Sequence, residues 1–408
     1  MKVGFAFGCA CLAVLAIAPS VHAQMSPEAV AALQAPVDVK RSQEVETVPL
    51  VPHMGKYAIQ ASVNGVERSF VFDTGAPTMI SQELAEQLDL KVIGENTGRD
   101  ANGKEFTTRI ALVDQLRIGG LTFSDIPVLI ADFKISDPNG CFIGAGVIGS
   151  NIFPGSVWHI DGEQNVLQIA AEAHDIPGLQ RASADIETDL HIDGYPYAPV
   201  FDYAFGSFED RALFDTGNSD TIILFDRVTG DKRVQQAIVA GSRTEGRGSH
   251  GVSAAGIGAT TDLLRFELDG MNLGSALPRL SATTRNAPPS LIGLGILNRY
   301  HVTLDYSADR MMLHERDRPA ATSVYPGYGL MMRQGAVKVV QLFEGSVAER
   351  AGLRLGDEVV AIDGRDLSEQ PGACGVARWL AEDRPTQDAS TLTVMRDGAP
   401  VEISLQRP

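Results

Sequence analysis

Two copies of one short motif contain the residues of this chain whose type and spacing suggest chemistry. Phe70–Gly75 reads Phe-Val-Phe-Asp-Thr-Gly, and Ala212–Gly217 repeats it in the second half of the chain as Ala-Leu-Phe-Asp-Thr-Gly. Two carboxylates about 3 Å apart cannot both ionise, so they hold one proton between them. If Asp73 and Asp215 meet in this way, the ionised carboxyl can take a proton from water while the protonated one donates to a carbonyl oxygen. The pair predicts hydrolysis by general acid–base catalysis, without a covalent intermediate.

A second repeat indicates that the motif belongs to two similar halves. A single Asp-Thr-Gly is typical of a turn at the end of a strand, because aspartate and glycine favour turns. Here each copy follows an apolar strand and precedes an apolar-apolar-glycine segment, Val147–Gly149 in the first half and Leu291–Gly293 in the second. We therefore expect two lobes, residues 46–172 and 190–316, related by a pseudo-twofold axis that brings the aspartates together.

The elements that must position these residues are mainly β-strands. Tyr57–Val63 and Val66–Phe72 flank Asn64-Gly65, a strong signal for a two-residue hairpin turn. Short strands, frequent glycines and few helical periods predict an all-β lobe in each half, with a short helix around residues 81–88. The polar and acidic residues 171–193 are expected to connect the lobes.

The two halves resemble aspartic peptidases of the retropepsin and pepsin types over about residues 45–315. The resemblance implies a bilobal β fold in which Asp73 and Asp215 are catalytic and no metal or other cofactor takes part. With both motifs in one chain, it implies a monomer that contains an internal pseudo-dimer. The supporting active-site loop residues that it implies are Thr74, Gly75, Ala76, Thr216, Gly217 and Asn218. Ala76 matches the retroviral form of the motif, whereas Asn218 matches neither common form.

Two glycine-containing segments are candidate flaps over the cleft. They are Gly98–Thr108, with an Asn102-Gly103 turn, and the glycine-rich Glu245–Gly258. A flap that excludes water from a bound peptide needs flexible backbone of this kind. The alternative is that both are ordinary exposed hairpin loops. No tyrosine lies between Tyr57 and Tyr195, so the flap tyrosine of pepsins is missing from the first lobe, which favours the retropepsin type.

The sequence pattern changes after about Pro319 to that of a small α/β domain, residues 322–408. Residues 325–406 resemble a PDZ domain, on a stretch that runs from Gly345-Ser346-Val347-Ala348 to Ala361-Ile362-Asp363-Gly364. PDZ domains bind peptide C-termini beside a strand and a helix, with loop N–H groups holding the terminal carboxylate. The resemblance places the helix residues Val376 and Leu380 opposite a ligand loop made of Tyr328, Gly329, Leu330, Met331 and Met332. Alternatively, the domain packs on the lobes and binds no free ligand.

Charge and histidine pattern exclude other classes of function. Acidic residues outnumber basic ones, 51 to 34, and the formal net charge of −17 repels nucleic acids and anionic lipid headgroups. We therefore expect no nucleic-acid partner. The eight histidines form no His-Glu-x-x-His motif, so the sequence gives no support to a zinc peptidase.

Residues 1–23 are expected to be a secretory signal peptide. Lys2 precedes the apolar run Val3–Ala18, and Val21-His22-Ala23 offers small residues before a cleavage site. An uncleaved anchor is the alternative, and no later segment is apolar enough to span a membrane. Residues 24–45 are expected to be a loose leader. Cys141 and Cys374 are the cysteines left after cleavage, and we expect them to be buried or inert thiols.

These observations predict an exported aspartic endopeptidase, periplasmic or secreted into the medium, that acts on proteins or peptides. Its PDZ domain would bind C-terminal tails of substrates or partners. The alternative is a non-catalytic periplasmic adaptor that binds peptides in a degenerate protease cleft. A further hypothesis is that the PDZ domain regulates the protease.

Overall fold

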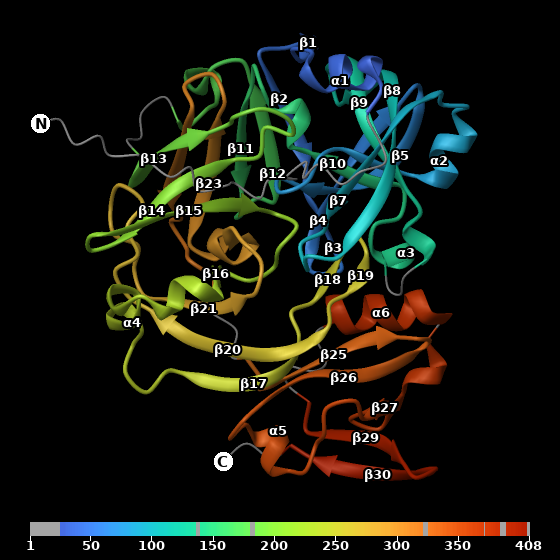
Figure 1. Ribbon diagram of the computed structural model, residues 1–408, viewed down its shortest axis with the longest axis vertical. Coiled ribbons are helices and arrows are strands. Elements are labelled where there is room, and N and C mark those ends of the chain that lie inside the picture. Colours follow the sequence, from blue (N-terminus) through green and yellow to red (C-terminus); the bar gives the residue numbers. More distant parts are fainter. Residues whose placement is uncertain are drawn as a thin grey trace, which may run out of the picture.

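The computed structural model describes residues 25–135, 139–179, 184–320, 325–370, 372–383 and 389–405 (Figure 1). The expected signal peptide lies outside these residues. The fold is mainly β, as predicted: two lobes lie side by side, they share a central sheet, and a small C-terminal domain lies against both of them.

The first lobe is a strongly curved sheet. Its strands are β1 (Asp38–Arg41), β3 (Val51–His53), β4 (Lys56–Val63), β5 (Val66–Asp73), β6 (Met79–Ser81), β7 (Val92–Arg99), β8 (Glu105–Ile118), β9 (Leu121–Ala131) and β10 (Gly146–Gly149). Its helices are α1 (Pro27–Gln34), α2 (Gln82–Gln87) and α3 (Asn139–Phe142). The predicted Asn64-Gly65 turn is present, with both residues at positive φ and Val63 paired with Val66 across it. The predicted short helix is α2, whose first turn is capped by the Ser81 hydroxyl.

The second lobe repeats the strand order of the first. Its strands are β14 (Val200–Phe205), β15 (Phe208–Asp215), β16 (Ile222–Phe225), β17 (Thr244–Ser249), β18 (Val252–Ser253), β19 (Gly256–Ile257), β20 (Thr260–Leu268), β21 (Leu280–Arg285) and β22 (Ser290–Gly293), and its α-helix is α4 (Lys232–Ala237). In the first lobe β5 runs parallel to β10 with Asp73 opposite Gly149, and in the second β15 runs parallel to β22 with Asp215 opposite Gly293. The two apolar-apolar-glycine segments are therefore the parallel neighbours of the two motif strands.

A six-stranded antiparallel sheet joins the lobes. Its strands, in spatial order, are β2 (Val45–Pro49), β12 (Val166–Ala170), β11 (Val157–Asp161), β23 (Tyr300–Asp305), β24 (Arg310–Glu315) and β13 (Ile186–His191). The central pair β11 and β23 comes from different halves of the chain. Trp158 on β11 is fully buried, with its ring centroid 6.3 Å from Phe72 of the first lobe and 4.3 Å from Phe153. Trp158 therefore packs the central sheet against the core of the first lobe.

The expected leader and the expected inter-lobe connection are both part of this framework. The supposed loose leader, residues 24–45, contains α1, whose Ala29 is fully buried, and β1, which pairs with β9. The connection 171–193 contains β13, an edge strand of the central sheet. The prediction of a loose leader was wrong, because this segment, which has few apolar residues, is held by pairing with a longer strand. Residues 171–193 lie between the two lobes in the chain and add a strand to the central sheet.

The C-terminal domain has its own core. Its elements are β25 (Tyr328–Arg333), β26 (Ala336–Phe343), α5 (Val347–Arg350), β27 (Glu358–Ile362), β28 (Arg365–Asp366), α6 (Gly372–Glu382), β29 (Thr391–Arg396) and β30 (Ala399–Ser404). Val339, Ile362, Leu392 and Val394 are buried at its centre. The expected ligand loop, Tyr328–Met332, is a strand and not a loop, since all of it belongs to β25 and pairs with β26. Among the described residues, the short 3-10 helices are η1 (Phe133–Ile135), η2 (Ser150–Ile152), η3 (Ala173–Asp175), η4 (Asp226–Gly230), η5 (Leu294–Asn298) and η6 (Leu367–Glu369).

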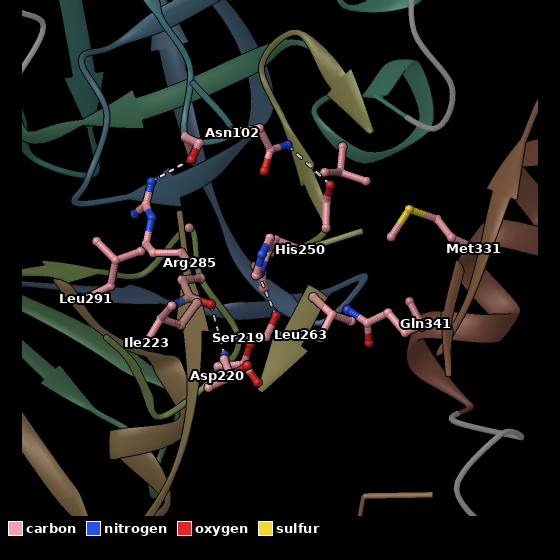
Figure 2. Close-up of a pocket in the computed structure, with 18 of the residues that line it drawn as sticks. Asn102, Ser219, Asp220, Ile223, His250, Leu263, Arg285, Leu291, Met331 and Gln341 are labelled. Carbon is pink, nitrogen blue, oxygen red and sulfur yellow. Dashed lines mark hydrogen bonds between the residues drawn. The ribbon is translucent and has the colours of Figure 1, made fainter. Parts of the chain in front are cut away.

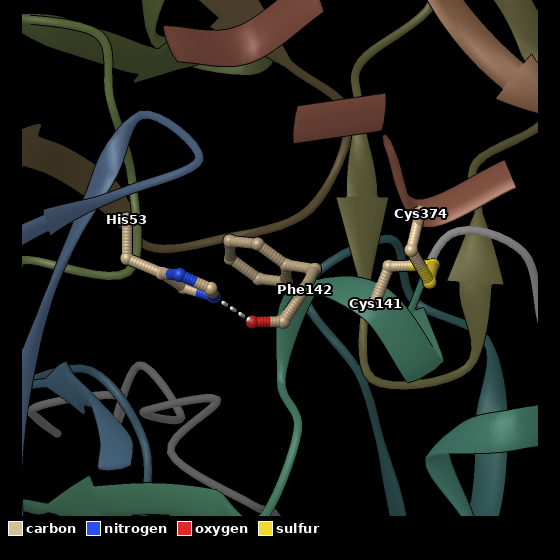
Figure 3. The surroundings of a disulfide bond; sticks show 4 residues. All are labelled: His53, Cys141, Phe142 and Cys374. Atoms are coloured by element: carbon tan, nitrogen blue, oxygen red, sulfur yellow. Dashed lines mark hydrogen bonds between the residues drawn. A yellow bond between two sulfur atoms is a disulfide. The ribbon is translucent and has the colours of Figure 1, made fainter. Parts of the chain in front are cut away.

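Two connections fix the C-terminal domain to the lobes. Strand β26 pairs with β17 of the second lobe, with Gly246 opposite Phe343. On the other side, Cys141 of α3 and Cys374 of α6 form a disulfide with their Cα atoms 5.1 Å apart (Figure 3). The prediction of two unpaired thiols was wrong, because a sequence separation of 233 residues says nothing about distance once α6 lies against α3. His53 holds the same helix, since its Nε2 donates to the Phe142 carbonyl at 2.8 Å.

Within the described residues, no helix is both long and apolar enough to cross a membrane.

Candidate active site

The ends of β5 and β15 bring Asp73 and Asp215 together. A Cβ atom placed on Gly217 would lie 2.4 Å from Oδ2 of Asp73, and one placed on Gly75 would lie 2.7 Å from Cγ of Asp215. Each aspartate therefore packs against the glycine of the opposite motif. Any larger residue at either position would push a carboxyl out of place, which gives a physical reason for glycine in both motifs.

The two threonines lock the motif loops to each other. Thr74 N–H donates to Oγ1 of Thr216 at 3.0 Å, and Thr216 N–H donates to Oγ1 of Thr74 at the same distance. Each hydroxyl in turn donates to a carbonyl in the opposite lobe, Thr74 to Phe214 at 2.6 Å and Thr216 to Phe72 at 2.8 Å. Both side chains are almost fully buried, so these four hydrogen bonds lie away from water and fix the distance between the aspartates.

Burial raises the pKa of Asp73 well above its ordinary value. The charge of Asp215 and a hydrogen bond between the two carboxyls act in the same direction, while the Gly75 N–H and the charge of Lys56 oppose the rise. The Gly75 N–H donates to Oδ1 of Asp73 at 2.9 Å. A close pair of carboxyls of this kind holds a proton that an isolated aspartate would lose.

The residues after each motif are supported in the same way in both lobes. The Ala76 carbonyl accepts from Ser150 N–H at 2.9 Å, and the Asn218 carbonyl accepts from Leu294 N–H at 2.8 Å. The Asn218 side chain accepts from Asp220 N–H at 3.0 Å, so it closes its own loop. Asn218, which departs from the common forms of the motif, thus leaves the loop geometry intact.

The two candidate flap segments meet each other. Asn102 at the tip of the β7–β8 hairpin donates from Nδ2 to Ser253 Oγ at 2.9 Å. Ser253 donates to the Asp100 carboxylate, which also accepts from Ala255 N–H at 3.1 Å. Lys104 donates to the Ala255 carbonyl at 2.8 Å. Since Asp100 and Ser253 line the same cavity as Asp73 and Asp215, the two hairpins cover the aspartate pair.

Two cavities meet at Asp215. One, of about 250 Å³, contains both aspartates and is lined largely by apolar side chains, among them Val71, Met79 and Leu129. The other, of about 440 Å³, extends from Asp215 towards the C-terminal domain (Figure 2). In Figure 2, Met331 and Gln341 of that domain lie on one side of this space and His250 and Arg285 of the second lobe on the other.

Comparison with known proteins identifies two parts of the chain. Residues 59–152, which include the first motif, match the aspartyl protease family, and residues 338–387 match the PDZ domain. The chain carries an aspartyl-protease-like domain followed by a PDZ domain. The expected resemblance to aspartic peptidases with a C-terminal PDZ domain is thereby confirmed.

Two individual proteins show more limited similarity to this PDZ-containing chain. A protein of Ralstonia nicotianae, whose name describes it as a zinc metalloprotease, is 33% identical over 89 residues. The match covers 22% of this chain and 18% of that protein, so the chain spans less than a fifth of its length. The crystal structure of an aspartic proteinase from Irpex lacteus has a TM-score of 0.40 at 14% identity and covers 69% of this chain and 100% of its own. The described residues contain no group of three or more His, Cys, Asp or Glu side chains that could hold a metal ion.

Sequence reasoning missed two cations in the aspartyl-protease-like cleft. Lys56, at the start of β4, donates from Nζ to Ser219 Oγ at 2.6 Å. Burial lowers its pKa, and the charge of Asp215 opposes the change. Arg285, at the end of β21, is 8% exposed and donates to the Ala101 carbonyl in the first flap at 2.5 Å. Burial lowers its pKa too, again against the charge of Asp215.

No signal in the sequence could have placed these cations. Lys56 belongs to the first lobe, yet its bond partner Ser219 belongs to the second, and Arg285 of the second lobe bonds to the first. Their position depends on how the lobes are packed together, which no local pattern encodes. The ligand residues expected for the PDZ domain, in contrast, fall on the strand β25, which faces α6.

Proposed function

We propose that this chain is an aspartic endopeptidase that hydrolyses peptide bonds in proteins or peptides with the Asp73–Asp215 pair and a water molecule. The observation that carries the proposal is the reciprocal packing of each aspartate against the glycine of the opposite motif. This packing forces the two carboxyls to share one site, in a cavity that residues of both hairpins also line. A protein that only bound peptides would have no chemical need for two adjacent carboxyls.

The raised pKa of Asp73 supports one proton held between the two carboxyls at neutral pH. In the reaction that we propose, Asp73 carries this proton and Asp215 acts as the base. Asp215 takes a proton from water as the water oxygen attacks the carbonyl carbon, and Asp73 gives its proton to the carbonyl oxygen. In the second step Asp215 gives its proton to the amide nitrogen, Asp73 takes one from the resulting diol, and the C–N bond breaks. An acid and an amine leave, and both aspartates return to their starting states.

The proposed catalytic pair is tested by measuring how fast the enzyme hydrolyses an unfolded substrate protein between pH 3 and 8. We expect Asp73→Asn and Asp215→Asn each to lower kcat by at least about 100-fold, because each removes a proton donor or acceptor of the reaction. Asp114→Asn, at an exposed position on β8, is the matched control and should keep wild-type activity. Activity near that of the wild type in either site variant would exclude a shared pair. Binding of peptides by the wild type without any product would favour the adaptor.

We propose that the enzyme is exported and acts outside the cytoplasm, in the periplasm or the medium. The sequence of residues 1–23 and the Cys141–Cys374 disulfide support this location, since disulfides persist in oxidising compartments. N-terminal sequencing of the protein from its native source tests it. Gln24 is expected as the first residue, and a chain that still begins at Met1 would contradict cleavage.

A further inference from the structure

The groove of the PDZ domain lies between β25 and α6. β25 pairs with β26 along one edge, and α6 packs on its other side. PDZ domains add a peptide as an extra strand in such a position. Leu330 and Met331 of β25 and Ala377 and Leu380 of α6 all line the cavity of about 440 Å³.

The same cavity reaches the aspartate pair. Its other wall contains Asp215 and Gly217 of the second motif, with Lys56 of the first lobe beside them. Its volume is that of an ordinary ligand site, which spans roughly 300–1,000 Å³. The PDZ groove and the catalytic cleft are therefore one continuous space, and a polypeptide in the groove needs no further channel to reach Asp215.

Two attachments hold the PDZ domain in the position that joins its groove to the cleft. β26 is paired with β17, the strand that leads into the second flap, and α6 is bonded through Cys374 to α3 of the first lobe. Phe142 of α3 lines both cavities. The groove is thus attached to both walls of the cleft, on either side of the cavity.

The charges in the cavity favour a carboxylate. Lys56, Arg265 and Arg285 all line it, against the acidic Asp215 and Asp220. Arg265 stacks over the ring of Tyr325, 4.0 Å from its centroid, at the point where the PDZ domain begins. A free carboxyl terminus would meet these cations where the groove enters the cleft, whereas a neutral amide would gain less from them.

We propose that one polypeptide occupies the PDZ groove and the catalytic cleft at the same time, with its C-terminal segment and free carboxylate in the shared cavity. Hydrolysis then takes place close to the C-terminus of the substrate, and the enzyme shortens tails instead of cutting chains at random. This inference rests on the proposed peptidase activity and adds the class of substrate.

The experiment compares one peptide in two forms, with a free C-terminal carboxylate and with a C-terminal amide, on the protein spanning residues 24–408. We expect kcat/KM for the free acid to exceed that for the amide at least tenfold, through KM. Leu380→Glu places a negative charge in the groove and should raise KM for the free acid to that for the amide. Leu355→Glu, at an exposed leucine elsewhere on the PDZ domain, is the matched control and should change neither constant.

Mass spectrometry of the products tests the proposal without any variant. Cleavage sites clustered near the C-terminus of an unfolded protein are expected. Sites spread evenly along the chain, or equal kcat/KM for acid and amide, would overturn the shared site. If the wild type cleaves nothing, the proposed function fails, and binding of the two labelled peptides then decides the inference. Binding that requires the carboxylate and is lost in Leu380→Glu supports the shared cavity, and absence of binding overturns it.

Discussion

Asp73 and Asp215 occupy equivalent places in the two motifs, but their surroundings are not equivalent. Lys56 approaches the pair from the first lobe, and its charge lowers the pKa of Asp73 against the larger effect of burial. A cation this close to the two carboxyls stabilises their ionised forms. Lys56 therefore contributes to the pH at which the protonated member of the pair is lost.

Replacement of Lys56 by methionine should move the alkaline limb of the pH–activity profile to higher pH. The substitution keeps most of the length of the side chain and removes the charge that lowers the pKa of Asp73, so that this pKa rises further. The protonated carboxyl that the reaction needs then persists to higher pH. The measurement is kcat/KM from pH 3 to 8, with Lys40→Met, on an exposed part of β1, as the control. An unchanged alkaline limb would show that Lys56 does not act on the pair.

At the level of the elements, the central sheet contains a group of three histidines. The ring of His159 on β11 lies 6.0 Å from that of His301 and 6.5 Å from that of His314, measured between centroids. Burial, followed by the charges of His301 and His314, lowers the pKa of His159 to about 4, while Asp161 opposes the change. His159 also bonds through Nδ1 to Thr303 Oγ1 at 2.8 Å, which links the two halves of the sheet.

The free energy of unfolding should fall as the pH drops from about 6.5 to about 4. Above pH 6.5 His159 is neutral in both the folded and the unfolded chain. Between pH 6.5 and about 4, His159 binds a proton in the unfolded chain but stays neutral in the folded sheet. The loss amounts to about 3 kcal/mol. Urea unfolding at pH 7 and pH 4.5 measures it, and His159→Gln should remove most of the difference.

The control for this prediction is His174→Gln, since the side chain of His174 is 78% exposed. It should leave the pH dependence as in the wild type. A His159→Gln variant with an unchanged dependence would assign the acid sensitivity to other groups.

Much of the framework could be predicted from patterns within each half of the chain. The repeated motif and glycine segments predicted two β lobes, and in the structure each aspartate packs against the glycine of the opposite motif. Features that depend on packing between distant segments could not be predicted. In the segment that holds α1 and β1, β1 is held by pairing with β9. Lys56 lies beside the aspartate pair because the two lobes pack together, and its bond partner Ser219 belongs to the second lobe.

For the molecule as a whole, the disulfide between Cys141 and Cys374 ties the PDZ domain to the first lobe. Replacement of both cysteines by serine should destabilise the protein by about 2–5 kcal/mol, since the bond restricts the unfolded chain over a long loop. Thermal unfolding with and without dithiothreitol measures the effect. The reductant should lower the Tm of the wild type to that of the variant and leave the variant unchanged. An equal effect on both proteins would place the sensitivity elsewhere.

The same bond turns part of the polypeptide into a closed ring. The ring runs from Cys141 through the whole second lobe to Cys374, so a single backbone cut anywhere within it leaves both fragments covalently attached. Truncation after Arg318 is therefore more than the loss of a domain. It opens the ring, leaves Cys141 without its partner and takes β26 away from β17 at the base of the second flap. A chain cut once between the second lobe and the PDZ domain keeps that domain through the disulfide, whereas a truncated chain loses it. The two proteins would thus differ, although the peptide link between the lobes and the PDZ domain is broken in both.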